Sequence, residues 1–474
     1  MTTLAVTNPR TGKPDYEIHQ VSKTEVEQIA TDLRSSQARW LDIGIAGRCE
    51  AMRRWATVIA QNKNVIAEAL CVDTGRRVVS HHEVDGLVNK VEHWCSLAPD
   101  LLSASQAQTS SMVPSVEYRH HLVPYSLVGI ISPWNFPLTL AMIDAIPALL
   151  SGACVLLKPS EVTPRFIKPL SDTLQQIEEL RDVLKIITGG AETGIALIDN
   201  VDTICFTGSV ATGRKVGMQA AKSFIPAFLE LGGKDPAIVL KSADIDNTTT
   251  AILRSAVGMT GQACQSLERV YVHESIVDEF VQTITNKAQA LKYNWPNIDS
   301  GQIGPLIFAE QAAKIDQQLQ QAVALGAQVH CGGKVETHDG GRWIAPTVIT
   351  HVDHSMALMT EETFGPIIPI MSFSTTADAL ALANDSIYGL SGAIFSGDVK
   401  EAEQIGAQME VGAVSINDGG LTAFVHDSEK NSFKLSGIGG SRMGASGLSR
   451  FLRKRVLLTQ SAPAVPLSVF SEGQ

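Results

Sequence analysis

The sequence lacks three features that would assign it to a specialised class of protein. Its seven cysteines are an odd number and form no C-x-x-C pair, so we predict neither a disulfide framework nor a metal site. Most of these thiols are expected to be small core residues. The net charge is −11, whereas nucleic-acid binding needs a basic face that releases counterions, so we expect no nucleic-acid partner.

A long uninterrupted apolar run is the third missing feature. The most apolar region, Tyr125 to Lys158, is broken by Pro133, Asn135 and Asp144 before about twenty apolar residues accumulate. The first residues, Met1 to Pro9, show no charged stretch followed by an apolar core, so no signal or transit peptide is visible. We expect a cytoplasmic protein with no membrane partner.

The remaining composition is that of a large folded protein. A chain of 474 residues exceeds what one hydrophobic core usually supports, so more than one lobe is expected. The first hundred residues look helical, because apolar residues recur with a spacing near 3.6 in Thr24–Ala38, Gly44–Gln61 and Val84–Cys95.

Two α/β lobes are predicted from the periodicity that follows. Short apolar, β-branched runs alternate with amphipathic stretches, a pattern typical of a parallel sheet flanked by helices. The first series comprises Leu127–Ile131, Cys154–Leu157, Leu184–Ile187 and Thr203–Thr207. The second comprises Ala237–Leu240, Arg269–Val272 and Ile367–Phe373, with helices at Asp278–Leu291 and Ala309–Leu325. Turn chemistry at Gly232–Pro236 suggests the crossing between the lobes.

Asn135 is the first candidate functional residue. It lies in Ser132-Pro-Trp-Asn-Phe-Pro137, directly after a predicted strand. Two prolines stiffen this turn, so the Asn135 amide could point its NH2 group at a fixed place, as an oxyanion donor must. A plain rigid turn is the alternative.

Two further motifs follow predicted strands. Lys158-Pro-Ser-Glu161 would lie where ligands bind in open α/β sheets, and its lysine and glutamate could hold the hydroxyls of an adenosine ribose. A solvated strand end is the alternative. Phe206 to Gly213 reads as a strand followed by glycines that open a helix, which exposes backbone N–H groups to a phosphate. It is not the G-x-G-x-x-G fingerprint, and many ordinary turns carry Gly and Ser.

A carboxylate and a thiol complete the candidates. Glu230 lies between leucines in Leu229-Glu-Leu-Gly-Gly-Lys-Asp-Pro236, where burial would raise its basicity toward that of a general base. A solvated strand glutamate is the alternative. Cys264, in Gly261-Gln-Ala-Cys-Gln265, falls where a helix gives way to a strand, so it is either an exposed nucleophile or an inert buried thiol.

In order and spacing, these motifs resemble the aldehyde dehydrogenase superfamily over nearly the whole chain. The matching stretches are P-W-N-F-P, K-P-S-E, F-T-G-S-x-x-x-G, E-L-G-G-K, G-Q-x-C and Glu361-Glu-Thr-Phe-Gly-Pro366. The resemblance implies an α/β fold with a Rossmann-type cofactor domain, an α/β catalytic domain and a small β oligomerisation element. We assign 1–105 and 125–232 to the NAD-binding domain, 233–445 to the catalytic domain, and 106–124 and 446–474 to the oligomerisation strands and C-terminal tail.

The same resemblance implies a mechanism. Cys264 would attack the aldehyde, the Asn135 amide and the Cys264 backbone N–H would hold the alkoxide, and Glu230 would activate the water that hydrolyses the thioester. The residues implied in cofactor binding are Trp134, Lys158, Glu161, Gly189, Gly208, Ser209, Gly213, Glu362 and Phe364. Because the Glu161 carboxylate accepts from a 2′-hydroxyl but repels a 2′-phosphate, we expect NAD in preference to NADP.

The chain departs from the family pattern after Ser415-Ile-Asn417. Many members carry P-F-G-G-x-K-x-S-G here, whereas this sequence reads Phe424-Val-His-Asp-Ser-Glu-Lys-Asn-Ser-Phe-Lys-Leu-Ser-Gly437. In this unusual loop, 418–436, His426 and Phe433 could line the aldehyde entrance or be an ordinary surface histidine and a packing phenylalanine. An apolar, medium-chain or aromatic aldehyde is the expected substrate.

The C-terminal segment also has an implied role. By resemblance, Arg450 to Gln460 forms an oligomerisation strand that pairs with Ser115 to Leu122, and the chain forms a homodimer or a homotetramer. Two other functions stay open at this point. One is a CoA-acylating dehydrogenase, which generally lacks the glutamate matched by Glu230. The other is a non-catalytic structural protein on the same fold, which would not need Cys264, Glu230 and Asn135 together.

Overall fold

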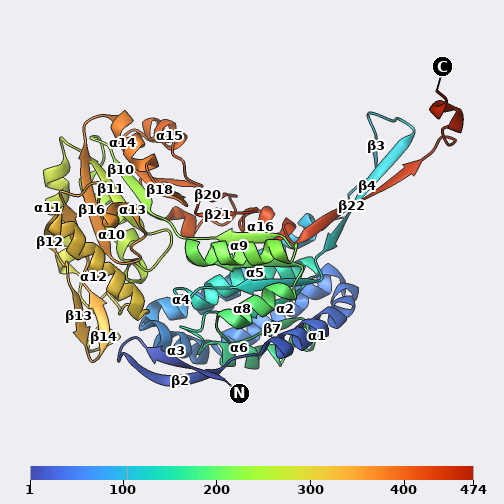
Figure 1. The fold of residues 1–474 in the computed structure, drawn as a ribbon, viewed down its shortest axis with the longest axis horizontal. Coiled ribbons are helices and arrows are strands. Elements are labelled where there is room, and N and C mark those ends of the chain that lie inside the picture. The colour runs from blue at the N-terminus through green and yellow to red at the C-terminus, as the bar shows by residue number, and fades with distance from the viewer. Residues whose placement is uncertain (1, 104, 473–474) are drawn as a thin grey trace.

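The computed structural model describes residues 2–103 and 105–472. Its main body contains two parallel sheets with their covering helices, and an arm of antiparallel strands extends away from that body toward the C-terminus (Figure 1). Among the described residues, no helix combines the length and the apolar character that crossing a membrane requires.

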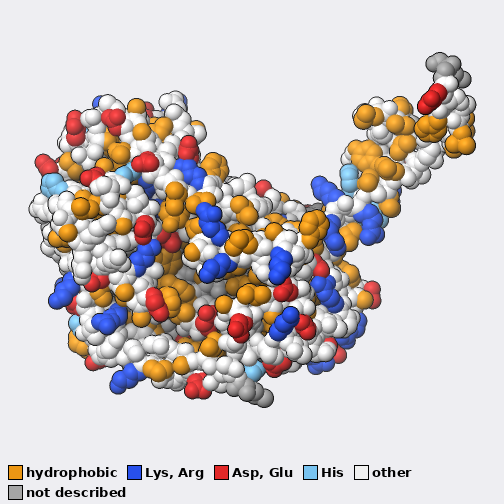
Figure 2. All heavy atoms as spheres, viewed as in Figure 1, with side chains coloured by type: hydrophobic (Ala, Val, Ile, Leu, Met, Phe, Trp, Pro, Cys, Tyr) orange, Lys and Arg blue, Asp and Glu red, His pale blue; other side chains and the backbone are white. Residues whose placement is uncertain are grey.

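The arm consists of β3 (Gln108–Thr109), β4 (Val116–Pro124) and β22 (Leu452–Gln460). β22 pairs with β4 in antiparallel register from Leu452 opposite Pro124 to Gln460 opposite Val116. This confirms the pairing expected between the C-terminal segment and the region after Ser115. Hydrophobic side chains gather on the arm (Figure 2), and those of Val456, Leu457 and Leu458 are exposed.

The first sheet has the strand order β21-β9-β8-β5-β6-β7. Its strands are β5 (Leu127–Ile131), β6 (Cys154–Lys158), β7 (Leu184–Ile186), β8 (Thr203–Thr207), β9 (Ala227–Glu230) and β21 (Gly437–Ile438). All pair in parallel except β21, which runs antiparallel to β9. The intervening helices are α5 (Pro137–Ser151), α6 (Ile167–Leu174), α7 (Glu178–Arg181), α8 (Ala191–Asp199) and α9 (Val210–Lys222).

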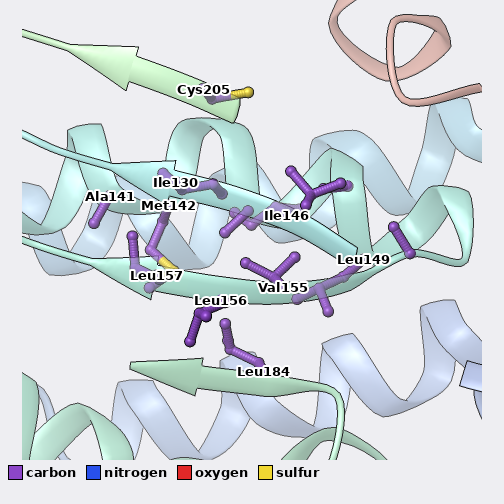
Figure 3. Packing of buried hydrophobic residues seen from close by; sticks show 14 of the residues in the cluster. Ile130, Ala141, Met142, Ile146, Leu149, Val155, Leu156, Leu157, Leu184 and Cys205 are labelled. Atoms are coloured by element: carbon purple, nitrogen blue, oxygen red, sulfur yellow. The ribbon is translucent and has the colours of Figure 1, made fainter. Parts of the chain in front are cut away.

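The first sheet is buried on both faces, which explains its continuous apolar strands. A Cβ atom at Gly129 of β5 would lie 2.6 Å from Leu197 Cδ2 of α8, so Gly129 faces α8. The next residue, Ile130, packs with Met142 and Ile146 of α5 (Figure 3). Successive residues of a strand face opposite sides, so α5 and α8 lie on opposite faces of the sheet.

The second sheet has the strand order β12-β15-β16-β11-β10-β18-β19. Its strands are β10 (Asp235–Val239), β11 (Leu267–His273), β12 (Gln328–Cys331), β15 (Thr347–Thr350), β16 (Ile367–Phe373), β18 (Gly392–Phe395) and β19 (Val414–Ile416). Only β12 pairs antiparallel within it. The associated helices are α10 (Ile245–Val257), α11 (Val277–Ala290), α12 (Ala309–Ala324), α13 (Ala357–Thr360), α14 (Thr376–Asn384) and α15 (Val399–Gly406).

The N-terminal region is only partly helical, so the expectation that the first hundred residues look helical was wrong at their start. Helices α1 (Lys23–Asp42), α2 (Gly44–Gln61), α3 (Lys63–Thr74) and α4 (Arg77–Leu101) follow a hairpin of β1 (Thr3–Asn8) and β2 (Lys13–His19). Val6 and Ile18 are the only fully buried residues of these two strands. One inward-facing apolar residue per strand gives no period-two signal, which is why the hairpin was not recognised.

Candidate active site

A cavity of about 860 Å³ lies at the carboxyl ends of β5, β6 and β8. Residues from both halves of the chain line it, including Asn135 after β5 and Cys264 before β11. The predicted site residues that line it are Trp134, Asn135, Lys158, Glu161, Gly208, Ser209, Cys264, Glu362 and Phe364. The structure therefore brings motifs from positions 134 to 364 to a single cavity.

Cys264 follows an unusual backbone segment. Met259 and Thr260 adopt positive φ angles of 52° and 59°, and Gly261 has φ +70°. A Cβ atom at Gly261 would lie 2.2 Å from the backbone carbon of Gly365, so only glycine lets this loop pass against the Glu361–Pro366 segment. Cys264 is partly exposed as a residue, whereas five other cysteines are buried, as expected for small core residues.

Burial, together with the carboxylates of Asp235, Glu362 and Glu230, raises the pKa of the Cys264 thiol to about 12, while the Lys430 ammonium opposes the shift. At neutral pH the thiol is therefore protonated in this structure. Because the thiolate is the nucleophilic form, the thiol must lose its proton before it can attack a substrate.

Asn135 lies beside the Cys264 loop. Its side chain is buried, and Nδ2 donates a hydrogen bond to the backbone carbonyl of Gln262 at 2.9 Å. A carboxamide carries two N–H donors, and the second has no partner among the described residues. The backbone N–H of Cys264 likewise donates to none of the residues in 2–103 and 105–472. Two neighbouring donors are thus free to bind a ligand.

Glu230 lies at the end of β9, at the edge of this cavity. Leu231 and Gly232, the next two residues, line the cavity, but Glu230 itself does not. Its Oε2 atom accepts a hydrogen bond from Ser432 Oγ at 3.0 Å. The carboxylate is close enough to raise the pKa of the Cys264 thiol. Cys264 and Asn135 therefore share the cavity, and Glu230 lies behind its wall, against the 418–436 loop.

Lys158 and Glu161, from the end of β6, also line the cavity. Lys158 Nζ donates to the Gly189 carbonyl at 2.8 Å and lies 3.3 Å from Glu161 Oε2. Burial lowers the pKa of the Lys158 ammonium. The Glu161 side chain is 45% exposed, so this carboxylate still has room to accept a hydrogen bond from a ligand.

The glycines of the site have different positions. Gly208 lines the cavity beside Ser209, whose hydroxyl caps α9 by accepting from Thr212 N at 3.3 Å. Gly189 and Gly213 do not line the cavity. Gly189 supplies the carbonyl that binds Lys158, and a Cβ atom at Gly213 would lie 2.4 Å from Leu231 Cδ2. These two glycines shape the walls.

Glu362 and Phe364 form the wall nearest Cys264. Glu362 Oε1 accepts from the Gly233 N–H at 3.1 Å, and burial raises the pKa of the Glu362 carboxyl to about 7. The Phe364 ring contacts the Trp134 ring edge-on, with centroids 5.4 Å apart. The backbone of Phe364 has φ 54°, a conformation that phenylalanine rarely adopts.

Sequence reasoning missed several residues that line this cavity, and a buried carboxylate that supports one of its walls. Phe308 and Gln311, at the start of α12, line the cavity, and no motif marked them. Glu268 accepts hydrogen bonds from the backbone N–H groups of Thr363 and Phe364 at 2.7 Å. A charged residue inside the apolar β11 strand was the signal that could have revealed it, because buried carboxylates need partners.

The 418–436 loop contributes neither His426 nor Phe433 to this cavity. His426 is half-buried, its Nε2 lies 3.1 Å from the Ala423 carbonyl, and burial lowers the pKa of its imidazole to about 4. The side chain of Phe433 is 46% exposed. Their relation to an aldehyde entrance stays a prediction.

The fold matches that of solved aldehyde dehydrogenase structures. The structure has a TM-score of 0.97 with the putative aldehyde dehydrogenase PutA from Anabaena variabilis, with 50% identity, over 99% of this chain and 100% of that one. For lactaldehyde dehydrogenase from Escherichia coli the TM-score is 0.92, with 29% identity, over 97% and 96% of the two chains. These similarities define the class as an oxidoreductase.

The particular family follows from the sequence comparisons. Residues 1–457 match the aldehyde dehydrogenase family, and the chain therefore belongs to that family and oxidises an aldehyde. A putative succinate-semialdehyde dehydrogenase of Mycolicibacterium smegmatis, named for NADP(+), is 32% identical over 432 residues, which are 90% of this chain and 83% of that protein. A betaine aldehyde dehydrogenase structure from Staphylococcus aureus contains NAD+. Relatives thus use either dinucleotide.

Proposed function

We propose that this enzyme oxidises an aldehyde to the free carboxylic acid with NAD, through a thioester on Cys264. The observation that carries the proposal is the shared cavity. The Cys264 thiol and the Asn135 amide lie in the same cavity as Lys158 and Glu161, so a reactive centre and a nucleotide-binding end are connected. This volume is within the range of small-molecule sites.

The first step is attack on the aldehyde carbonyl by the Cys264 thiolate, which forms a carbon–sulfur bond and turns the carbonyl oxygen into an alkoxide. The free Asn135 N–H and the Cys264 backbone N–H are the donors available for that negative charge. Prepositioned donors stabilise developing charge more than mobile water does. The hydride then leaves the substrate carbon, and the thioester remains on Cys264.

The residues of the cavity suit a nicotinamide dinucleotide. Ser209 and Thr212, at the N-terminus of α9, line the cavity. The two residues between them, Val210 and Ala211, have backbone N–H groups without partners among the described residues, and such groups bind phosphate. Lys158 and Glu161 would hold the adenosine ribose, and Glu362 and Phe364 the nicotinamide end. When bound, the nicotinamide supplies the hydride acceptor.

The preference for NAD rests on Glu161. Its carboxylate is paired with Lys158 at 3.3 Å and is otherwise open to the cavity. A 2′-phosphate at the same place would bring two negative charges together, whereas a 2′-hydroxyl would donate to the carboxylate.

Hydrolysis completes the reaction. Glu230 would take a proton from water as that water attacks the thioester carbonyl, and the acid would leave as the carbon–sulfur bond breaks. The half-buried Glu230 carboxylate does not line the cavity that contains Cys264. The Glu230 side chain would therefore rotate toward the thioester or act through one intervening water.

Product analysis without coenzyme A tests the proposal. Enzyme, aldehyde and NAD alone should yield free acid and NADH in equal amounts over many turnovers, and Cys264→Ala should yield neither. A strict requirement for coenzyme A would overturn the hydrolytic assignment. Running a panel of apolar, aromatic and acid-bearing aldehydes in the same assay would test the expected apolar or aromatic substrate.

The proposal extends to assembly and location. The arm exposes Val456, Leu457 and Leu458, and exposed apolar strands of this kind suit association with a second copy of the chain. A homodimer or a homotetramer is the assembly that we propose. The domain boundaries at 105, 125, 232 and 445 and the cytoplasmic location also remain predictions.

A further inference from the structure

The 418–436 loop departs from the P-F-G-G-x-K-x-S-G pattern only in its first part. Lys434-Leu435-Ser436-Gly437 still matches the final K-x-S-G. By this alignment Ser432 stands where the pattern has its second glycine. The chain therefore carries a hydroxyl at a position where the common pattern has no side chain.

That hydroxyl contacts the Glu230 carboxylate. Ser432 Oγ donates to Glu230 Oε2 at 3.0 Å. Among the described residues, no other group hydrogen-bonds this carboxylate, so Oε1 stays available for a water molecule. With glycine at position 432, the carboxylate would lose its one side-chain partner.

Two strand pairings fix Ser432 against Glu230. Gly437 of β21 lies opposite Glu230 in the antiparallel pair with β9. Phe433, the residue after Ser432, lies opposite Gly389 in the pair of β20 (Phe433–Lys434) and β17 (Tyr388–Gly389). The segment that directly follows Ser432 is thus held by two strand pairings.

The turn between these strands adds a further anchor. The Ser436 carbonyl accepts from Leu231 N at 2.8 Å, and Ser436 Oγ donates to the Gly232 carbonyl at 2.7 Å. A Cβ atom at Gly437 would lie only 2.9 Å from Ser432 Cβ. Gly437 therefore leaves the space that the Ser432 side chain occupies.

We propose that Ser432 is a positioning residue for the hydrolytic step, which holds the Glu230 carboxylate with one oxygen directed to water. This inference rests on the proposed role of Glu230 as the general base. A carboxylate fixed before the reaction loses less rotamer freedom when it takes the proton from water.

Loss of the Ser432 hydroxyl should slow thioester hydrolysis without changing the rate of hydride transfer. Ser432→Ala should slow thioester hydrolysis by about tenfold, the effect expected when a charge-assisted hydrogen bond is lost. The first burst of NADH should keep its parent rate.

The experiment compares five variants by stopped-flow NADH absorbance, which follows the burst, and by acid release, which follows hydrolysis. Ser432→Ala is the test, and Ser432→Thr, which keeps a hydroxyl, should hydrolyse the thioester at the parent rate. Ser428→Ala, in an exposed part of the same loop, is the matched control and should behave as the parent. Adding Ser432→Ala to Glu230→Gln should slow hydrolysis no further.

Two results would overturn this inference alone. A parent hydrolysis rate in Ser432→Ala would show that the hydrogen bond has no role. Equal slowing of the burst and of hydrolysis would show a general structural defect. If Glu230→Gln itself hydrolyses the thioester at the parent rate, the general-base assignment fails first, and this outcome is distinguishable because it does not depend on residue 432.

Discussion

The ammonium of Lys234 and the carboxylate of Glu268 lie 2.7 Å apart, and both side chains are fully buried. Glu268 also accepts from the backbone N–H groups of Thr363 and Phe364, and Lys234 donates to Thr363 Oγ1 at 2.8 Å. One ion pair therefore joins the Leu229–Pro236 segment to the segment that carries Glu362 and Phe364. These contacts account for the positive φ angle that Phe364 holds at the cavity wall.

Removing this carboxylate should cost stability and cofactor affinity together. Glu268→Ala leaves a buried ammonium and two backbone N–H groups unpaired, which should lower the free energy of unfolding by about 3–5 kcal/mol. The KM for the dinucleotide should rise because the Phe364 backbone loses its anchors. Urea unfolding and cofactor titration measure the two effects. Asp172→Ala, which breaks an exposed pair with Lys168, should cost less than about 1 kcal/mol. Equal losses in the two variants would contradict this account.

Alkylation of Cys264 should depend strongly on pH. Burial raises the pKa of this thiol to about 12, so the reactive thiolate fraction rises with pH, and the iodoacetamide rate should increase about tenfold per pH unit between pH 7 and 10. Lys430→Met should slow the reaction at each pH, since the Lys430 charge opposes the upward shift in the pKa of Cys264. Mass spectrometry in a Cys331→Ser background isolates the signal, because Cys331 is the other partly exposed thiol. A rate that levels off near pH 7 would show that the thiol pKa is much lower.

Glu161 should set the cofactor preference. Glu161→Gln removes the charge that repels a 2′-phosphate, so kcat/KM with NADP should rise by about tenfold relative to NAD. Glu178→Gln, at an exposed position on α7, should leave the ratio unchanged. An unaltered ratio in the Glu161 variant would mean that another group selects the cofactor.

Association between copies of this chain should depend on the arm. Leu458→Lys places a charge on an exposed apolar strand, where it would have to be buried if two arms pair, and so should shift the enzyme toward smaller species in sedimentation velocity. Val323→Lys changes a comparably exposed apolar residue on α12 and serves as the control. The same assembly in both variants would argue against an interface at the arm.

The sequence predicted those parts of the fold whose signal is local and periodic. β5, β8 and β16 match their predicted bounds, since buried parallel strands read as short continuous apolar runs. The N-terminal hairpin was missed because its strands are mostly polar and exposed. In the site, the cavity-lining positions of Asn135, Lys158 and Cys264 followed motifs. The buried pair of Lys234 and Glu268 depends on a contact between distant segments, which no local pattern encodes.

The most direct test of the central claim is the number of NADH molecules that Glu230→Gln forms per subunit in a single rapid mixing with aldehyde and NAD. The account predicts a burst of one equivalent at the parent rate, followed by little turnover, with the acyl group recovered on Cys264 by mass spectrometry. Continuous NADH formation at the parent rate, or an acyl group on any other residue, would contradict it.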